Sequence, residues 1–253
     1  MSILERILAQ KRQELAALRA MKLPPAPRAR PFSLKRAPEQ PLSIVAEIKL
    51  RSPSAGALST HLSVAQRAAA YARSGAAAIS VLCDSKFFDG GYPHLLEARS
   101  ACDLPLLCKE FVIDECQLDV ARAHGADAVL LIARYLEDSA LARLHAAALD
   151  RGLTPLVEVA TESDARRALS VGARTIGVNA RDLDTLVMDA SLAEGIFALI
   201  PSHLERIYLS GLQTAADVRR VSNLGVDAAL VGETLMRQDD PEPLLSSLVT
   251  AAG

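Results

Sequence analysis

Four segments of the chain repeat one pattern, a glycine followed by a short apolar run: SGAAAISVL (74–82), HGADAVLLI (124–132), VGARTIGVN (171–179) and LGVDAALVG (224–232). A glycine before a strand is typical of a helix end, where a left-handed residue turns the chain toward the next strand. The four glycines lie 50, 47 and 53 residues apart, which is about the length of two β-α units. The repeat therefore predicts four double units in series.

Strand-type runs alternate with helical runs through the rest of the chain. The runs that we interpret as strands are 43–49, 77–82, 105–111, 127–133, 154–159, 175–179, 206–210 and 227–232. Helical periodicity is clearest at 63–74, 115–124, 139–150 and 214–223. Eight strands, each followed by a helix, favour a closed barrel over an open doubly wound sheet, so we predict the α/β class and a (β/α)8 TIM barrel.

The first 40 residues are expected to precede the barrel. Residues 1–22 place apolar side chains at helical spacing and mix both charge signs, which predicts an amphipathic helix and not a signal peptide. Prolines at 24, 25 and 27 end that helix. We expect one domain over 1–253, with a helical extension and linker at 1–40 and the barrel at 41–253. The helix could cover the barrel mouth, cap its bottom or meet a partner.

Composition narrows the classes of partner. The 253 residues carry a formal charge of −2, only 4% aromatic residues and no Trp, which argues against nucleic-acid binding. No apolar run is long enough for a membrane-spanning helix. The four cysteines show neither metal-ligand spacing nor a disulfide framework, so we expect no metal site and a reducing, cytoplasmic location. A monomer or weak homodimer is expected.

Polar residues at the carboxyl ends of the strands should form the functional site, because these ends share one face of the barrel. Glu47 and Lys49 lie two apart on the first strand and hence on one face, and Asn179 ends the sixth. Charged strand ends are often merely solvated. Glu158, however, has apolar neighbours on both sides, as does Glu47, and a buried carboxylate needs a partner such as Lys109.

Lysine is scarce in this chain, since only six of the 28 basic residues are Lys. Two of the six, Lys49 and Lys109, fall on predicted strand ends. The pKa of a lysine can be shifted for proton transfer, whereas a guanidinium stays protonated. We therefore expect Lys109, Glu158 and Glu47 to form an acid–base site.

Glycines after the last two strands indicate an anion site. Ser210-Gly211 and Gly232-Glu233 would let backbone N–H groups approach a phosphate, with Lys49 and Ser52 within reach from the first unit. Ordinary tight turns are the alternative. Lys49 would serve either phosphate binding or proton transfer.

Six motifs in order resemble signatures of the indole-3-glycerol-phosphate synthase family of tryptophan biosynthesis: ILERILAQKRQEL (3–15), AEIK (46–49) with SPS (52–54), CKEFVID (108–114), LVEV (156–159), GVNARDL (177–183) and LVGE (230–233). The resemblance implies a lyase that closes a ring on 1-(2-carboxyphenylamino)-1-deoxyribulose 5-phosphate, a small phosphorylated substrate. Carbon dioxide and water are lost, and no cofactor is implied.

The resemblance also implies roles by matching position. Lys109 would protonate the ribulose carbonyl, Glu158 would handle the proton lost in dehydration, and Glu47 and Asn179 would orient and stabilise intermediates. The implied substrate-binding residues are Ser52 and Arg181, with Phe111, Leu183 and Leu230 around the aromatic ring and Lys49, Ser210, Gly211, Gly232 and Glu233 in the phosphate region.

Three positions depart from the family pattern. Leu209 stands where the family usually has a Glu before Ser-Gly, Ala55 where it has a Lys, and Gly90-Gly91 where it has Gly-Ser. Leucine neither exchanges a proton nor counters the charge of a lysine. Two alternatives therefore stay open: a divergent paralogue with weakened or redirected activity on a related N-aryl amino-sugar phosphate, or a non-catalytic binding barrel.

Overall fold

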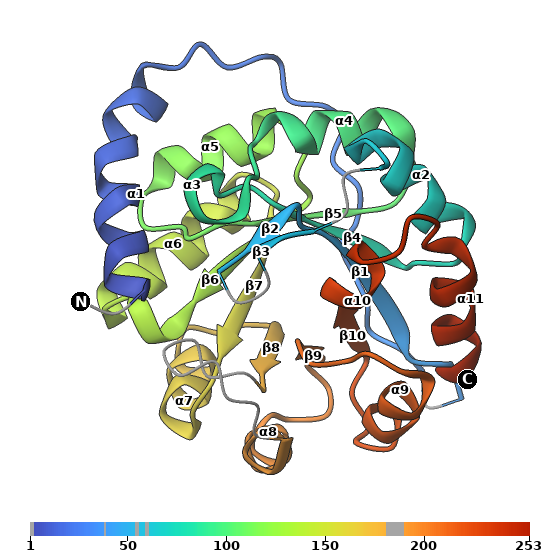
Figure 1. Cartoon of the computed structure of the whole chain (residues 1–253). Coiled ribbons are helices and arrows are strands. Elements are labelled where there is room, and N and C mark those ends of the chain that lie inside the picture. Colours follow the sequence, from blue (N-terminus) through green and yellow to red (C-terminus); the bar gives the residue numbers. More distant parts are fainter. Residues whose placement is uncertain (1–2, 38, 54–55, 59–60, 181–189) are drawn as a thin grey trace.

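Eight parallel strands close into a barrel in the computed structural model, which describes residues 3–37, 39–53, 56–58, 61–180 and 190–253 (Figure 1). The strands are β1 (Ser43–Ile48), β4 (Ala78–Leu82), β5 (Leu106–Lys109), β6 (Ala128–Ile132), β7 (Thr154–Val159), β8 (Thr175–Asn179), β9 (Glu205–Leu209) and β10 (Ala228–Val231). Each strand pairs with the next along the chain, and β1 closes the ring against β10. The predicted (β/α)8 barrel is confirmed.

Helices surround the barrel and follow its strands. They are α2 (Val64–Arg73), α4 (Pro93–Ala101), α5 (Glu115–Ala123), α6 (Asp138–Asp150), α7 (Glu162–Ser170), α8 (Ala190–Leu199), α9 (Ala215–Ser222) and α11 (Glu242–Ala251). The sequence pattern did not predict the short elements at the strand ends: the hairpin β2 (Arg51–Ser52) and β3 (Gly56–Ala57), α3 (Ser85–Phe88), a 3-10 turn (Ala133–Tyr135) and α10 (Glu233–Met236). Among the helices of the described ranges, none is long and apolar enough to cross a bilayer.

The four repeat glycines take the conformation that the sequence predicts. Gly75, Gly125, Gly172 and Gly225 have φ values of 87°, 93°, 77° and 67°, in the left-handed region. Each follows a helix and precedes a strand, so glycine there permits the sharp turn without a Cβ clash.

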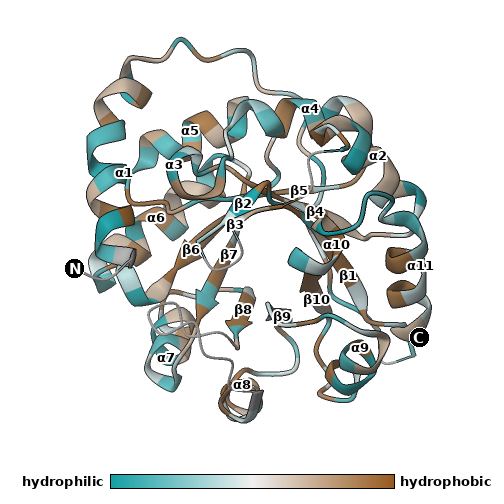
Figure 2. Ribbon diagram, in the orientation of Figure 1, coloured by the Kyte–Doolittle hydropathy of each residue, from teal (hydrophilic) through white to brown (hydrophobic). Residues whose placement is uncertain are grey.

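Apolar side chains fill two layers, one between the strands and the helices and one inside the barrel. The strands are accordingly mostly brown in Figure 2, while teal residues lie on the helices. The inner layer includes Val45, Leu107, Leu130, Leu156 and Leu230, each at most 4% exposed. The inside of the barrel is thus a packed core, so a functional site has room only at the ends of the barrel.

The N-terminal extension reaches both ends of the barrel. Its linker crosses the bottom, where Phe32 and Leu34 pack into the inner layer and the Leu34 N–H donates to the Glu205 carboxylate at the start of β9. Its helix α1 (Ile3–Ala20) lies beside α5, and Ile7 on α1 lines the cavity at the mouth. The linker, not the helix, caps the bottom.

Candidate active site

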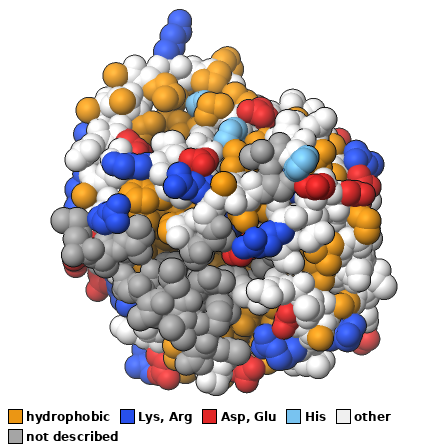
Figure 3. All heavy atoms as spheres, in the orientation of Figure 1, with side chains coloured by type: hydrophobic (Ala, Val, Ile, Leu, Met, Phe, Trp, Pro, Cys, Tyr) orange, Lys and Arg blue, Asp and Glu red, His pale blue; other side chains and the backbone are white. Residues whose placement is uncertain are grey.

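A cavity of about 300 Å³ opens at the carboxyl ends of the strands. Twelve of the predicted site residues line it: Glu47, Lys49, Ser52, Lys109, Phe111, Glu158, Asn179, Ser210, Gly211, Leu230, Gly232 and Glu233. Arg181 and Leu183 lie outside the described residues. Near the centre of the face that Figure 3 shows, basic side chains lie beside acidic ones. The carboxyl ends of the strands thus bring together side chains that are far apart in the sequence, as predicted.

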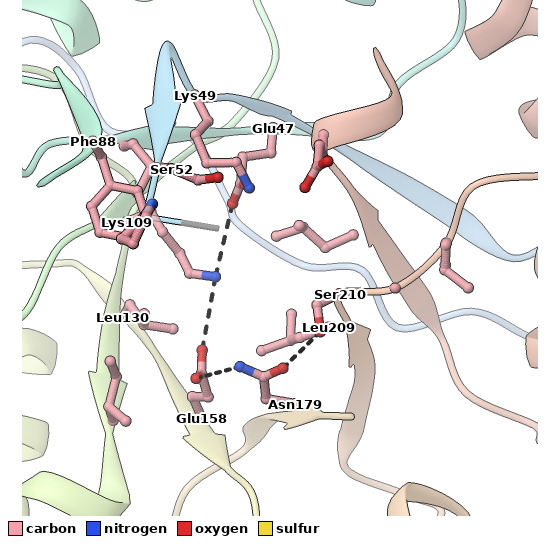
Figure 4. A pocket seen from close by; sticks show the side chains of 18 of the residues that line it. Glu47, Lys49, Ser52, Phe88, Lys109, Leu130, Glu158, Asn179, Leu209 and Ser210 are labelled. Atoms are coloured by element: carbon pink, nitrogen blue, oxygen red, sulfur yellow. Dashed lines mark hydrogen bonds and ion pairs between the residues drawn. The ribbon is translucent and has the colours of Figure 1, made fainter. Parts of the chain in front are cut away.

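Lys109 at the end of β5 points between two buried carboxylates (Figure 4). Its Nζ lies 3.8 Å from Glu47 Oε2 and 3.7 Å from Glu158 Oε2. The two glutamates are only 4% and 2% exposed. A buried pair of carboxylates needs cations, and Lys109 faces both.

A second lysine completes this cluster. Lys49 Nζ lies 2.9 Å from Glu47 Oε1, and Ser80 Oγ donates to the other oxygen of Glu47 at 3.4 Å. Burial acts to raise the pKa of Glu47, but Lys49 and Lys109 outweigh it and hold that pKa below its ordinary value. Glu47 therefore stays ionised in the cavity.

Glycine at position 232 makes room for this arrangement. An ideal Cβ built on Gly232 would lie 2.6 Å from Glu47 Oε1, far inside van der Waals contact. Any side chain at 232 would push the carboxylate away from Lys49. Glycine there has a packing reason besides access of backbone N–H groups to an anion.

Asn179 at the end of β8 joins Glu158 to the last strands. Asn179 Nδ2 donates to Glu158 Oε1 at 2.9 Å, and Ser210 Oγ donates to Asn179 Oδ1 at 2.7 Å. Ser210 has a φ of 68° and Gly211 a φ of 83°. A non-glycine residue in the left-handed region is strained, and such strain concentrates at functional sites.

An aromatic wall faces the charged cluster, and the sequence predicted only one of its two rings, that of Phe111. Phe111 follows β5, and Phe88 ends α3 with its ring centroid 6.1 Å from that of Phe111. Both line the cavity, as do Leu130 and Ile132 of β6. Phe88 could have been found in the sequence, because Asp84-Ser85-Lys86-Phe87-Phe88 is a helix start directly after a strand.

The predicted phosphate region contains the expected acidic residue, Glu233, and a cation that the sequence did not predict, Arg237. Glu233 Oε1 lies 2.7 Å from Arg237 NH2, one turn further along, and both line the cavity. The charge of Glu233 is therefore partly offset. Among the described residues, no group of three or more His, Cys, Asp or Glu is arranged to hold a metal ion.

Leu209, the departure on β9, lines the same cavity and is 1% exposed. Its Cδ1 would be 2.6 Å from an ideal Cβ on Gly177, so the leucine lies directly over that glycine. The position is filled by apolar packing inside the barrel, and Lys109 has its carboxylate neighbours without it.

Comparisons with known proteins identify the family of the chain. A family model described as indole-3-glycerol phosphate synthase matches residues 4–248. The synthase of Mycobacterium avium is 42% identical over 253 residues, which cover 99% of this chain and 93% of that protein. The synthase of Desulfotalea psychrophila is 41% identical and covers 97% and 98%. A solved 3-hexulose-6-phosphate synthase aligns with a TM-score of 0.64 at 19% identity over 84% of this chain and 100% of its own, which supports the fold alone.

Fold and site together define a (β/α)8-barrel lyase with a lysine–carboxylate cluster at its carboxyl face. The match extends over nearly the whole chain. The chain belongs to the indole-3-glycerol phosphate synthase family. The family resemblance of its motifs is thereby confirmed.

Proposed function

We propose that the chain closes the indole ring of 1-(2-carboxyphenylamino)-1-deoxyribulose 5-phosphate and releases carbon dioxide, water and indole-3-glycerol phosphate. The observation that carries the proposal is the position of Lys109, between Glu47 and Glu158 at distances of 3.8 and 3.7 Å and facing an aromatic wall. This arrangement offers a proton donor and a proton acceptor beside a slot for a phenyl ring.

In this reaction Lys109 protonates the carbonyl oxygen as the ring carbon attacks the carbonyl carbon. Loss of carbon dioxide restores the aromatic ring. The hydroxyl then leaves the former carbonyl carbon while Glu158 removes a proton from the neighbouring CH2 carbon. The proton on Glu158 and the departing hydroxide make the water that is released, and solvent returns a proton to Lys109. Glu47 and Asn179 hold these two groups in place through the contacts described above. A preorganised cluster of this kind lowers the barrier without reorganising charges during the step.

The remaining contacts orient the substrate. Phe111, Phe88 and Leu230 suit the phenyl ring, because apolar and aromatic side chains line that part of the cavity. Lys49 and the backbone at Ser210-Gly211 and Gly232 suit the phosphate, with Arg237 offsetting Glu233. By the family pattern, Arg181 and Leu183 would add to substrate binding.

Turnover of the purified protein tests the proposal directly. Because the chain has no Trp, indole fluorescence of the product can be followed without a tryptophan background from the protein. We expect Lys109→Ala and Glu158→Ala each to lower kcat by about 10²–10⁴-fold, the range typical of a lost acid–base group. Lys22→Ala, an exposed lysine in the linker, is the matched control. Absence of product from the wild-type chain, or near-normal kcat in either variant, would contradict the assignment.

A further inference from the structure

Helix α1 buries one lysine among three carboxylates. Lys11 is 1% exposed, and its Nζ lies 2.8 Å from Asp84 Oδ2, 3.0 Å from Glu110 Oε2 and 2.9 Å from Glu14 Oε2. Asp84 and Glu110 are themselves 0% and 2% exposed. Glu110 is 99 residues away in sequence, so this contact joins the extension to the barrel mouth.

Each of the two buried carboxylates also holds one side of the aromatic wall. The other oxygen of Asp84 accepts the N–H of Phe87 at 2.6 Å and so begins α3, which ends at Phe88. The other oxygen of Glu110 accepts the N–H of Phe111 at 2.7 Å. One ammonium thus connects the two backbone segments that carry the two rings.

The connection between the two segments depends on the positive charge of Lys11. Two fully buried carboxylates without a cation would repel each other and lose their hydration. Burial raises the pKa of Glu110 to about 7, because Lys11 and the Phe111 N–H offset the burial only in part and the charge of Asp84 acts in the same direction as burial. Removing Lys11 would take away the ammonium that bridges the two carboxylates, so the segments that they hold would no longer be tied together.

We propose that Lys11 is a positioning residue for substrate binding, which sets the spacing of Phe88 and Phe111 through Asp84 and Glu110. The extension therefore shapes the aromatic slot as well as packing on the barrel. This inference rests on the proposed function, because it takes the slot to be the place of the substrate's phenyl ring.

We expect the loss of Lys11 to change KM more than kcat. Lys109 is held by strand pairing, with Leu82 opposite it in β4, and faces Glu47 and Glu158, whereas Lys11 pairs with other carboxylates. In Lys11→Met, which keeps an unbranched side chain one atom shorter and removes the charge, we expect KM to rise about tenfold while kcat changes less than about threefold. Assays at about pH 8, above the Glu110 pKa of about 7, keep Glu110 mostly ionised in the wild-type reference. Arg12→Met, the exposed next residue on α1, removes the same charge and should leave both constants unchanged.

A second variant and a double-mutant cycle distinguish a positioning role of Lys11 from a role in folding alone. Glu110→Ala leaves Lys11 in place but cuts its link to Phe111, and we expect a similar rise in KM. In a Phe111→Ala background, Lys11→Met should raise KM less than about twofold, because one of the two rings whose spacing it sets is gone. A purely structural role would lower the active fraction, and hence kcat, equally in both backgrounds.

Binding of the product, indole-3-glycerol phosphate, gives a readout without turnover. Its fluorescence can be titrated against this Trp-free chain, and Lys11→Met should weaken Kd by about the same factor as KM. Unchanged KM and Kd in both Lys11→Met and Glu110→Ala would overturn the inference, while the wild-type chain still turned over. Absence of wild-type turnover would instead contradict the proposed function, and the Kd values would still decide the role of Lys11.

Discussion

Asn179 Nδ2 donates a hydrogen bond of 2.9 Å to Glu158 Oε1, which leaves Oε2 as the oxygen that faces Lys109 at 3.7 Å. The amide thus fixes which edge of the carboxylate meets the ammonium. Ser210 in turn fixes the amide, since it donates to Asn179 Oδ1. Residues on β8 and directly after β9 therefore set the orientation of the Glu158 carboxylate on β7.

Asn179→Ala should lower kcat more than it raises KM. Without the amide, Glu158 is free to rotate away from Lys109, and the acid–base pair loses alignment. We expect kcat to fall by about 10–100-fold, within the range of positioning effects in active sites. Steady-state kinetics of the purified variant check this. A rise in KM with unchanged kcat would show that Asn179 serves ground-state binding instead.

Gly232→Ala should displace the Glu47 carboxylate. The added Cβ would lie 2.6 Å from Glu47 Oε1, so the ion pair with Lys49 has to open. We expect kcat/KM to fall by at least about tenfold with the fold retained. Gly195→Ala is the matched control, because an added Cβ at that helical position meets nothing within 4 Å. Equal activity of the two variants would refute the packing role of Gly232.

Gly177→Ala should destabilise the barrel through Leu209. Its Cβ would lie 2.6 Å from Leu209 Cδ1 in the packed interior, and overpacking of this kind costs about 1–3 kcal/mol of the free energy of unfolding. In a Leu209→Ala background the added methyl has room, so the same substitution should cost much less. Chemical denaturation of the four chains measures the coupling. Additive losses would mean that the two side chains do not compete for one space.

Glu110→Gln should change how stability depends on pH. The folded-state pKa of Glu110 is about 7, above its ordinary 4.5, because of burial, with Lys11, Asp84, Cys83 and Tyr92 facing it. The folded protein therefore holds this proton more tightly, and the stability it contributes is lost as pH rises from about 4.5 to about 7.

Glutamine does not titrate, so the Tm of Glu110→Gln relative to wild type should rise between about pH 5 and pH 8. Thermal unfolding of both chains at the two pH values measures it. A constant difference in Tm would mean that Glu110 is ionised throughout this range in the folded state.

The sequence predicted the barrel because the evidence for it is local. The turn at Gly75 recurs at Gly125, Gly172 and Gly225, and each strand carries its own apolar run. The sequence also predicted that Lys109 and Glu158 lie on one face of the barrel, since parallel strands end at a common edge. The short elements were missed because α3 and the β2–β3 hairpin each span a few residues and leave no periodicity to detect.

By itself, then, the sequence determined the eight β-α units and the edge of the barrel where the polar side chains collect. Only the tertiary structure decided that Lys11 reaches Glu110 across 99 residues, that Phe32 packs into the bottom of the barrel, and that Glu47 lies against Gly232. The physical reason is the distance along the chain over which each kind of interaction acts. Turn and strand preferences act between neighbours in the chain, whereas the burial of a charge depends on which distant groups the closed barrel brings within a few ångströms of it.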